Sequence, residues 1–285
     1  DIYSYLANGS IVAQGMDPYS AGPVQLLGAG NKLARSVPFI WANSPSPYGP
    51  VALGLAAVVS AVTSNSILLG VITHRLLSIA GIIVAGWAIS CLARRCRVSP
   101  ESALWLGILN PLTILHLVGG IHNESIMLGL LLVGMELGLR GVDKLDASRR
   151  SAYLALVASG FCLSCAGMVK VTGFIGLGFV GMAYARRLIN AHGTARWKAL
   201  AYAIALQIIV LVATVALISV CTGISLGWIT GQGGAASIRS WLSTSTAVGV
   251  GTGFIGMLLG LGDHTEAILT VTLSLIHISE PTRQA

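Results

Sequence analysis

Charged residues are scarce in this chain. Asp, Glu, Lys and Arg make up 9% of its 285 residues, whereas 54% are hydrophobic and the mean hydropathy is +0.81. A soluble domain carries about 25% charged residues. The shortage of charge therefore excludes an ordinary soluble protein, and the apolar excess predicts a polytopic membrane protein.

The few charges are unevenly distributed, and the net charge is +7. Eleven of the 17 Lys and Arg residues fall in the stretches 94–97, 140–150 and 186–198, which hold three, four and four of them. Cytoplasmic loops of membrane proteins concentrate Lys and Arg, so we interpret these stretches as cytoplasmic loops. The positive charge then needs no nucleic-acid partner, and none is expected.

Cysteine is also sparse, with five residues in the chain. Cys162 and Cys165 have C-x-x-C spacing, but they lie in an apolar run without a second pair of ligands nearby. We interpret them as small core residues rather than as a metal or redox site. The sequence predicts no disulfide framework and no metal site.

Both ends of the sequence look unusual. The chain begins at Asp1 without Met and without a signal-like segment, so we expect at least one membrane helix to precede it in the native protein. Residues 274–285 resemble a translated sequencing adapter. We therefore expect one partial transmembrane domain at 1–273, followed by a non-native tail at 274–285.

Long apolar runs predict six or seven membrane spans that alternate in direction. Two further segments, 1–14 and 51–62, are expected to form shorter helices, the second of them interfacial or re-entrant. The loop 15–50 is rich in Pro, Gly and Ser, and loops of that length commonly bind or cover something. The predicted spans are 68–93, 101–118 with a break at Asn110-Pro111, 125–139, 152–169, 173–185, 200–220 and the short segment 248–261.

With the basic loops in the cytoplasm, the remaining unusual polar residues gather on the outer side of the membrane. Asp1 precedes Tyr3 and Tyr5, and a carboxylate followed by aromatic side chains suits a sugar site. The alternative is that Asp1 only caps the short helix that follows it. Asp17 and Tyr19 form a weaker candidate, because Asp-Pro is common in turns.

A polar island at 119–124 separates two apolar runs and is a second candidate. His122, Asn123 and Glu124 begin a helix whose N-terminal end favours an anion, and Asn123 is a candidate cap. The alternative is that these side chains only cap the turn and contact water.

Cations at the outer ends of spans also have two interpretations. Lys170 and Arg239 either snorkel to lipid headgroups or clamp the phosphate of a lipid-linked substrate, and His74 and Arg75 have the same two options. Glu136 lies near the cytoplasmic end of its helix and is expected to be structural.

Six short motifs follow one another along the chain. They are Asp1-x-Tyr3-Ser4-Tyr5, Gly15-x-Asp17-Pro18-Tyr19-x-x-Gly22-Pro23, Ser44-Pro45-Ser46-Pro47-Tyr48-Gly49-Pro50, Gly119-Gly120-x-His122-Asn123-Glu124, Val169-Lys170-Val171 and Arg239-Ser240-Trp241-Leu242-Ser243. Taken together, they resemble the motifs of the actinobacterial polyprenol-phosphomannose-dependent α-(1→6)-mannosyltransferases, which are multi-spanning enzymes of the GT-C class. The resemblance covers nearly all of residues 1–273, and the motifs occur in the family's order. One departure is Glu124, where the family motif more often has Asp.

The resemblance implies an all-α transmembrane bundle of GT-C type, with a long first extracytoplasmic loop that contains short interfacial helices. The implied reaction lies at the outer face of the inner (plasma) membrane. It moves mannose from polyprenyl-phosphate-mannose to a mannan acceptor in α-(1→6) linkage, with inversion, for lipomannan and lipoarabinomannan synthesis. No cofactor is implied, because the donor is itself a lipid.

The resemblance also implies roles for single residues. Asp1 matches the general base, and Arg239 or Lys170 would stabilise the leaving phosphate. His122 and Glu124 would orient sugar hydroxyls or support the base. The full implied set of substrate-binding residues is Tyr3, Asp17, Tyr19, Tyr48, His122, Asn123, Glu124, Lys170, Arg239 and Trp241.

Two other classes of function remain open. A lipid-linked sugar flippase or a secondary transporter would carry charged residues deep within its spans and a repeated half. Here the charges gather at one interface and no repeat is visible. A purely structural membrane subunit would not need a polar cluster on one side. Mannosyl transfer in membranes distinguishes the enzyme from both.

Overall fold

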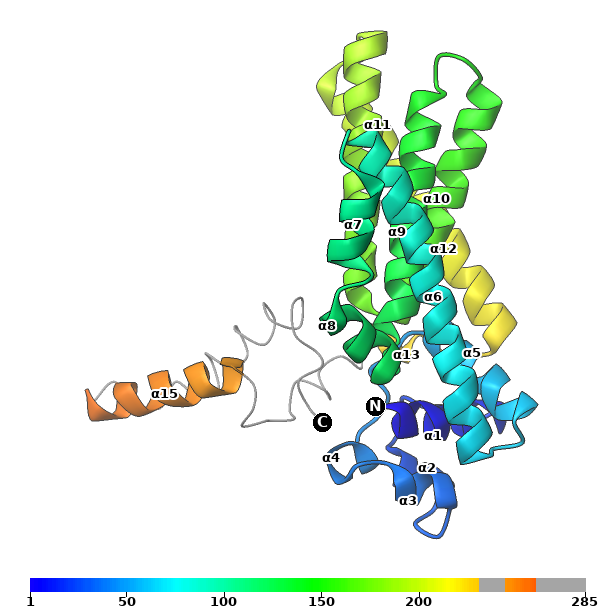
Figure 1. Ribbon diagram of the computed structural model, residues 1–285, viewed down its shortest axis with the longest axis vertical. Helices are drawn as coiled ribbons and strands as arrows, with labels where there is room; N and C mark the ends of the chain where they lie inside the picture. Colours follow the sequence, from blue (N-terminus) through cyan, green and yellow to red (C-terminus); the bar gives the residue numbers. More distant parts are fainter. Residues whose placement is uncertain (231–243, 260–285) are drawn as a thin grey trace. The chain divides into compact units, whose positions relative to one another are not determined.

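The computed structural model describes residues 1–230 and 244–259 of the chain. The chain divides into two compact units, Asp1–Trp228 and Ile229–Ala285. The first unit holds the helices of 18 or more residues (Figure 1). The second unit contains α15 (Thr244–Leu258), which has 15 residues. The described residues contain helices and no strands, in agreement with the predicted all-α class.

Four helices among the described residues are long and apolar enough to cross a membrane, and a fifth span results if one bent helix pair is counted. Each begins and ends within a few residues of a predicted span, because its apolar run is bounded by polar caps or basic residues. The four helices are α6 (Ile67–Arg95), α9 (Glu124–Asp143), α10 (Arg149–Val169) and α12 (Arg196–Thr222).

The bent pair occupies the predicted span 101–118. It consists of α7 (Pro100–Gly107) and, after the break, α8 (Pro111–Thr113) continued by η1 (Ile114–Gly119), and the two parts are bent by 49°. Pro111 has no N–H to extend α7, and the side chain of Asn110 accepts a hydrogen bond of 2.8 Å from the Leu112 N–H. The predicted break at Asn110-Pro111 is confirmed.

The predicted count of six or seven spans is too high for the described residues. The difference lies in α11 (Ile175–His192) and α15. The last turns of α11 carry Arg186, Arg187 and His192, which lower its mean hydropathy below that of a span, and α15 has only 15 residues. The segment after 259 lies outside the described residues.

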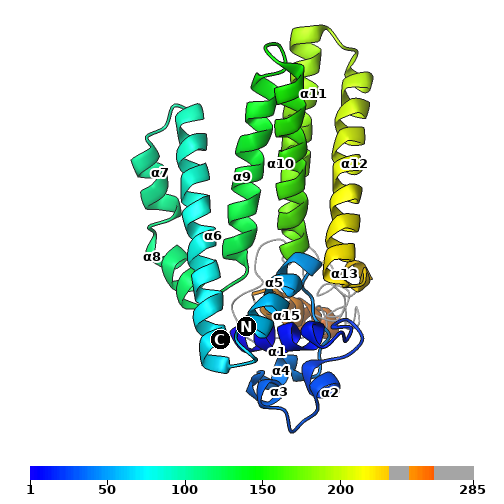
Figure 2. The ribbon, with the colours of Figure 1, turned by 90° about the vertical axis from the view of Figure 1, so that its right-hand side faces the viewer.

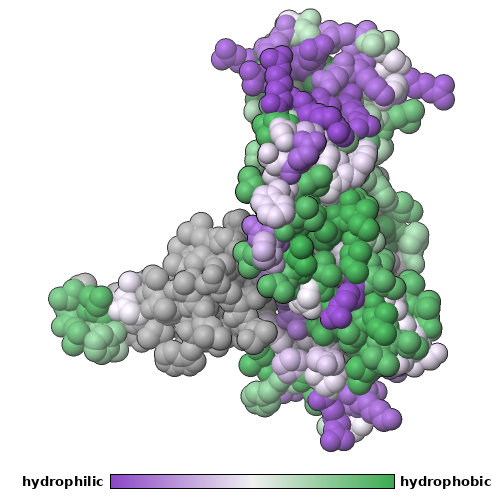
Figure 3. Space-filling view, in the orientation of Figure 1, coloured by the Kyte–Doolittle hydropathy of each residue, from purple (hydrophilic) through white to green (hydrophobic). Residues whose placement is uncertain are grey.

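The basic stretches 94–97, 140–150 and 186–198 lie at one end of the first unit, which we call the basic end. Helices α6, α9 and α11 end there, whereas α10 and α12 begin there (Figure 2). Hydrophilic residues cover both ends of the unit, and a hydrophobic surface lies between them (Figure 3). The predicted alternation of helix direction agrees with this arrangement.

Small residues let the long helices approach one another closely. A Cβ added at Gly129 of α9 would lie 2.8 Å from the backbone oxygen of Gly81 in α6. Ser159 of α10 donates a hydrogen bond of 2.5 Å to the carbonyl of Gly134 in α9. Lipid is as apolar as the helices, so close backbone contact and interhelical hydrogen bonds stabilise such a bundle. The buried core where α10, α11 and α12 meet includes Leu156, Leu163, Val180, Ala185, Ala199 and Ala203.

Glu136 is buried near the basic end and ties two helices together. Its carboxylate accepts hydrogen bonds from Nε of Arg140 at 2.7 Å and from Nε of Arg95 at 3.3 Å. Arg95 also pairs with Asp143. Loss of the carboxylate would leave two neighbouring cations without their buried partner. This geometry supports the structural role expected for Glu136.

A layer of short helices covers the opposite end (lower part of Figure 1). The loop predicted at 15–50 contains three of them, and the Ser46 N–H donates a hydrogen bond of 3.0 Å to the Pro18 carbonyl within it. Two others pack so closely that a Cβ at Gly9 would overlap the backbone of Ala56. The helices are α1 (Ile2–Ala13), α2 (Pro23–Leu27), α3 (Lys32–Ser36), α4 (Phe39–Ala42) and α5 (Pro50–Val62).

Candidate functional site

Asp1 occupies the position before α1, where an aspartate commonly caps the helix. Its side chain makes no cap hydrogen bond. Instead, Oδ2 of Asp1 lies 3.0 Å from Nδ1 of His122, although the direction of approach is not that of a hydrogen bond. The carboxylate is therefore directed at the turn 119–124, and helix capping does not explain it.

His122 is positioned by an unusual stretch of backbone. The residues before it form the π-helix η1, and Ile121 has a φ of +55°. A β-branched residue rarely adopts a positive φ, so this turn holds backbone strain. The π-helix places His116 against His122, with ring centroids 4.3 Å apart and ring planes at 26°. Sequence reasoning misses His116, because the apolar run around it gives no sign of a π-helix.

Glu124 begins α9, and Lys170 follows the last residue of α10. Nζ of Lys170 donates a hydrogen bond to Oε1 of Glu124, and the two side chains are only 17% and 14% exposed. Lys170 therefore points to a carboxylate rather than to lipid headgroups. Asn123 has the cap position of α9, as predicted, but its side chain makes no cap hydrogen bond.

These residues form one group, the Asp1 cluster, which comprises Asp1, His116, His122, Glu124 and Lys170. Burial lowers the pKa of His122 below its ordinary value, and the Glu124 carboxylate only partly opposes this. Burial likewise lowers the pKa of Lys170, against the opposing effect of Glu124. Burial thus favours the neutral form of His122, whereas the Asp1 carboxylate 3.0 Å from Nδ1 favours the protonated form.

Tyrosines connect the Asp1 cluster to the short helices beneath it. The buried ring of Tyr5 meets Tyr48 edge to face, with centroids 5.2 Å apart, and stacks with His74, with centroids 6.1 Å apart and ring planes at 28°. The Tyr19 hydroxyl donates a hydrogen bond of 2.9 Å to the Tyr48 carbonyl. Burial, followed by the charge of Glu124, raises the pKa of Tyr48, so its hydroxyl stays protonated.

A narrow cavity of about 20 Å³ lies beside Asp1. Ser4 and Asn8 line it, and their Oγ and Oδ1 atoms are buried without a hydrogen-bond partner among the described residues. Buried polar atoms nearly always have a hydrogen-bond partner, so we infer that Ser4 Oγ and Asn8 Oδ1 bind a water molecule or a substrate hydroxyl. The cavity has room for one water and is too small for a sugar ring. Trp41, Ser46 and Tyr48 also line it.

Asp17 lies in a turn of its own. One of its carboxylate oxygens accepts a hydrogen bond of 3.0 Å from the Tyr19 N–H and another of 3.4 Å from the hydroxyl of Ser225. Both contacts suit an exposed turn, and neither involves the Asp1 cluster. Its link toward that region is indirect, because Tyr19, whose N–H it binds, donates a hydroxyl hydrogen bond to the Tyr48 carbonyl.

Other predicted site residues lie apart from the cluster or beyond what is described. Tyr3 is 40% exposed. Nδ1 of His74 lies 3.0 Å from the Gly70 carbonyl within its own helix, and the ring is buried rather than directed to lipid. Arg239 and Trp241 lie outside the described residues.

The described part of the chain contains no group of three or more His, Cys, Asp or Glu side chains placed to hold a metal ion. Cys162 and Cys165 are free thiols. The expectation that no metal is needed stays a prediction. The chemistry that the described site can perform is proton transfer by a carboxylate, next to an imidazole and a paired ammonium.

Known proteins are similar in sequence to this chain over most of its length. The sequence model described as the N-terminal domain of alpha-(1->6)-mannopyranosyltransferases matches residues 1–186. The chain is 63% identical over 273 residues to alpha-(1->6)-mannopyranosyltransferase B of Corynebacterium glutamicum, covering 95% of this chain and 45% of that protein. It is 40% identical over 290 residues to a probable alpha-(1->6)-mannopyranosyltransferase of Mycolicibacterium smegmatis, covering 96% and 51%.

A third relative, alpha-(1->6)-mannopyranosyltransferase A of Mycobacterium tuberculosis, is 34% identical over 246 residues, covering 86% of this chain and 45% of that protein. The chain thus spans about half the length of the curated relatives it matches. No solved structure matches the chain. The GT-C architecture therefore stays a prediction.

Proposed function

The chain belongs to the alpha-(1->6)-mannopyranosyltransferase family, and on that premise we propose that it moves mannose from polyprenyl-phosphate-mannose to a mannan acceptor. The new linkage is α-(1→6), and the product is lipomannan or its precursor. The donor is a membrane lipid, which suits a chain whose described part has four or five helical segments apolar enough to cross a membrane. The reaction takes place on the outer face of the plasma membrane, at the end of the first unit that carries Asp1.

The observation that carries this proposal is the placement of Asp1. Its carboxylate lies 3.0 Å from the imidazole of His122 and lines a cavity with two unpartnered polar atoms. It also lies at the end opposite to the basic loops, which the positive-inside rule assigns to the cytoplasm. A carboxylate in this position is suited to accept the proton of a sugar hydroxyl.

In the proposed reaction, Asp1 is the general base. The 6-hydroxyl oxygen of the acceptor attacks the anomeric carbon of mannose, and its proton passes to the Asp1 carboxylate. The bond from the anomeric carbon to the phosphate oxygen breaks, and polyprenyl phosphate leaves with the bonding electrons. Because attack and departure occur on opposite faces of the sugar, a β-linked donor gives an α-linked product.

The leaving phosphate needs a cation as its charge develops. Lys170 is already paired with Glu124. We therefore assign Arg239 to the phosphate, and assign Lys170 to holding Glu124 in place. His122 and Glu124 then orient sugar hydroxyls. The remaining proposed contacts to substrate are Tyr3, Asp17, Tyr19, Tyr48, Asn123 and Trp241.

Mannosyl transfer in membranes tests the proposal. The chain is expressed within its complete open reading frame, and membranes receive polyprenyl-phosphate-mannose and an α-(1→6)-mannoside acceptor. We expect Asp1→Asn to lower transfer about 10²- to 10⁴-fold, the usual contribution of a positioned base. The control Asp143→Asn removes an exposed carboxylate at the basic end and should retain most of the transfer.

Two outcomes would count against the proposal. Undiminished transfer by Asp1→Asn contradicts the assignment of the base. Absence of transfer by the unmodified protein contradicts the enzyme, and movement of the lipid-linked sugar across the membrane without transfer would instead indicate a flippase.

A further inference from the structure

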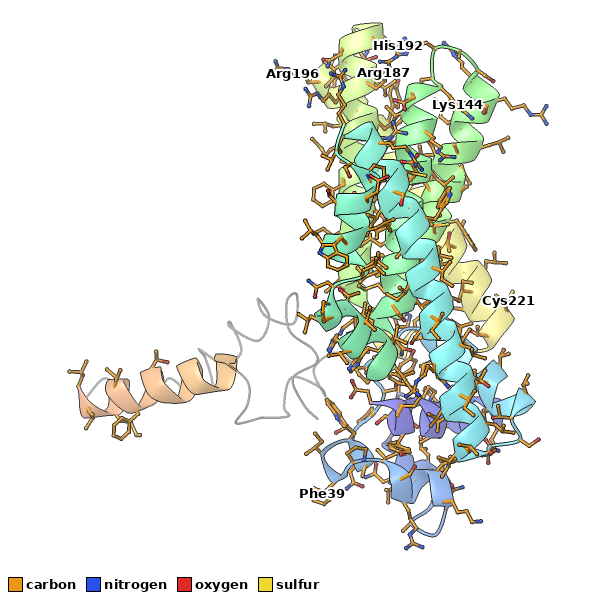
Figure 4. The ribbon with its side chains drawn as sticks, in the orientation of Figure 1. Phe39, Lys144, Arg187, His192, Arg196 and Cys221 are labelled. Carbon is orange, nitrogen blue, oxygen red and sulfur yellow. The ribbon has the colours of Figure 1, made fainter. Side chains whose placement is uncertain are left out.

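A second cavity lies at the basic end, opposite to the Asp1 cluster. It is bounded by α10, α11 and α12 and has a volume of about 520 Å³. Sites for drug-sized ligands have volumes of roughly 300–1,000 Å³. Arg149 at the start of α10 and His192 at the end of α11 line its mouth, and His192 is labelled in Figure 4. Nothing in the proposed sugar transfer uses this cavity.

The mouth of the cavity carries an excess of positive charge. No carboxylate in the described part of the chain pairs with Arg149. Asp146 is shared between Arg187 and His192, whose Nε2 lies 3.2 Å from it. One carboxylate therefore serves two basic groups, and Arg149 is left for an anion from outside the chain.

Two tyrosines in the wall supply a hydrogen-bond donor. The hydroxyl oxygens of Tyr153 and Tyr184 lie 3.0 Å apart. Only one proton can lie between two oxygen atoms, so the proton of the other hydroxyl is available to an acceptor. Tyr153 is 43% exposed, so that acceptor can reach it. Arginine and a tyrosine hydroxyl together suit a phosphate group.

The cavity continues from this polar mouth into the apolar zone of the bundle. Along α12, Tyr202 lies six residues after Arg196 and Ile209 thirteen residues after it, which correspond to depths of ~9 Å and ~20 Å. Ile209 is 66% exposed, and Trp197 near the start of α12 is 68% exposed. An exposed Trp next to basic residues is typical of a membrane–water interface.

We propose that this cavity binds one anionic phospholipid of the surrounding membrane. The phosphate of the headgroup contacts Arg149 and a tyrosine hydroxyl, and an acyl chain lies along Leu206 and Ile209. A neutral lipid lacks the net charge that Arg149 leaves unmatched, and a soluble anion lacks the chain that would cover the apolar wall. The site is independent of the proposed transferase reaction.

Native mass spectrometry of the purified, delipidated protein tests this proposal, with the chain in its complete open reading frame. We expect one molecule of phosphatidylglycerol to be retained in preference to phosphatidylcholine. Arg149→Gln should weaken retention roughly tenfold, the size of one charge-assisted hydrogen bond. Arg150→Gln, next along the chain but outside the lining, is the matched control and should retain the lipid.

Tyr153→Phe is a second variant, which tests the site if Arg149→Gln does not fold. It keeps the ring and removes the exposed hydroxyl, so retention of phosphatidylglycerol should weaken, and unchanged retention would overturn the site. Equal losses in Arg149→Gln and Arg150→Gln would overturn the site, because they would indicate attraction by the surface as a whole. Equal retention of phosphatidylcholine, displacement by inorganic phosphate, or stronger retention of polyprenyl phosphate would each overturn the assigned ligand.

Discussion

The Asp1 cluster contains two carboxylates and one lysine. Lys170 pairs with Glu124, and burial lowers the pKa of His122. Asp1 is therefore the carboxylate of the cluster that no Lys or Arg side chain pairs with in the described part of the chain, and it lines the narrow cavity with the unpartnered polar atoms of Ser4 and Asn8. A carboxylate without a matching cation keeps more of its basicity than a paired one.

The lowered pKa of His122 predicts the sign of a pH dependence. A free imidazole has a pKa of about 6.5, so His122 takes up its proton only below that pH. The imidazolium then pairs with Asp1 and competes for its carboxylate. We expect transfer to fall as the pH drops through the lowered pKa. Stability should fall in the same range, because the unfolded chain binds the proton more readily than the folded one.

A pH profile of kcat/KM checks this prediction. The acid limb should shift or disappear in His122→Gln, whereas the control His192→Gln at the basic end should keep it. The other ionisable groups facing His122 are Asp1, His116, Glu124 and Lys170. An acid limb that is unchanged in His122→Gln would assign the titration to one of these groups.

Single residues show where sequence reasoning stops. The polar character of Asp1, His122, Glu124 and Lys170 is visible in the sequence, and the structure brings all four together. Their pairing is not visible, because 46 residues separate Glu124 from Lys170 and only the packing of α9 on α10 joins them. The role of Arg239 stays a prediction, since that residue lies outside the described part.

At the level of helices, hydropathy and caps predict most of the fold. The predicted span 68–93 corresponds to α6 (Ile67–Arg95), since Ser66 caps its start and arginines end it. The break at Asn110-Pro111 follows from proline chemistry alone. The π-helix η1 does not follow, because Ile114–Gly119 has the composition of an ordinary apolar helix. For the loop 15–50, the resemblance implies short helices but does not predict where each of them begins and ends.

The contact between α6 and α9 leads to a prediction about stability. Gly129→Ala places a Cβ 2.8 Å from the Gly81 carbonyl oxygen, and the resulting strain should destabilise the protein by about 1–3 kcal/mol. In Gly178→Ala of α11, the added Cβ has no other atom within 4 Å. This change should be neutral or slightly stabilising, since Ala favours a helix. Thermal unfolding in detergent measures both, and equal midpoints would contradict this close packing.

On the scale of the whole molecule, chemistry is divided between the two ends of the first unit. The basic end holds most of the Lys and Arg residues and the proposed lipid cavity, and the other end holds the Asp1 cluster. In the sequence, the positions of the Lys- and Arg-rich loops are enough to predict this division. Which membrane face each end occupies is a separate prediction, based on the positive-inside rule.

Cysteine labelling in intact cells checks that orientation. Cys96 is exposed at the basic end, and Phe39, 89% exposed, lies at the other end and accepts a Phe39→Cys change (Figure 4). In a background without other cysteines, an impermeant maleimide should label Phe39→Cys in intact cells and Cys96 only after the membrane is opened. The reverse pattern would place the Asp1 cluster in the cytoplasm.

The π-helix η1 also constrains how the chain can change in length. A π-helix holds one residue more per hydrogen-bonded turn than an α-helix. Deleting one residue from Ile114–Gly119 would let an α-helix form there, and because the deleted residue is the extra one, the residues after it would keep nearly the same direction around the helix axis. The same deletion in an α-helix would rotate every later residue by about 100°. The stretch before His122 can therefore lose one residue in η1 at little cost to the direction of His122, which an α-helix in the same place would not permit.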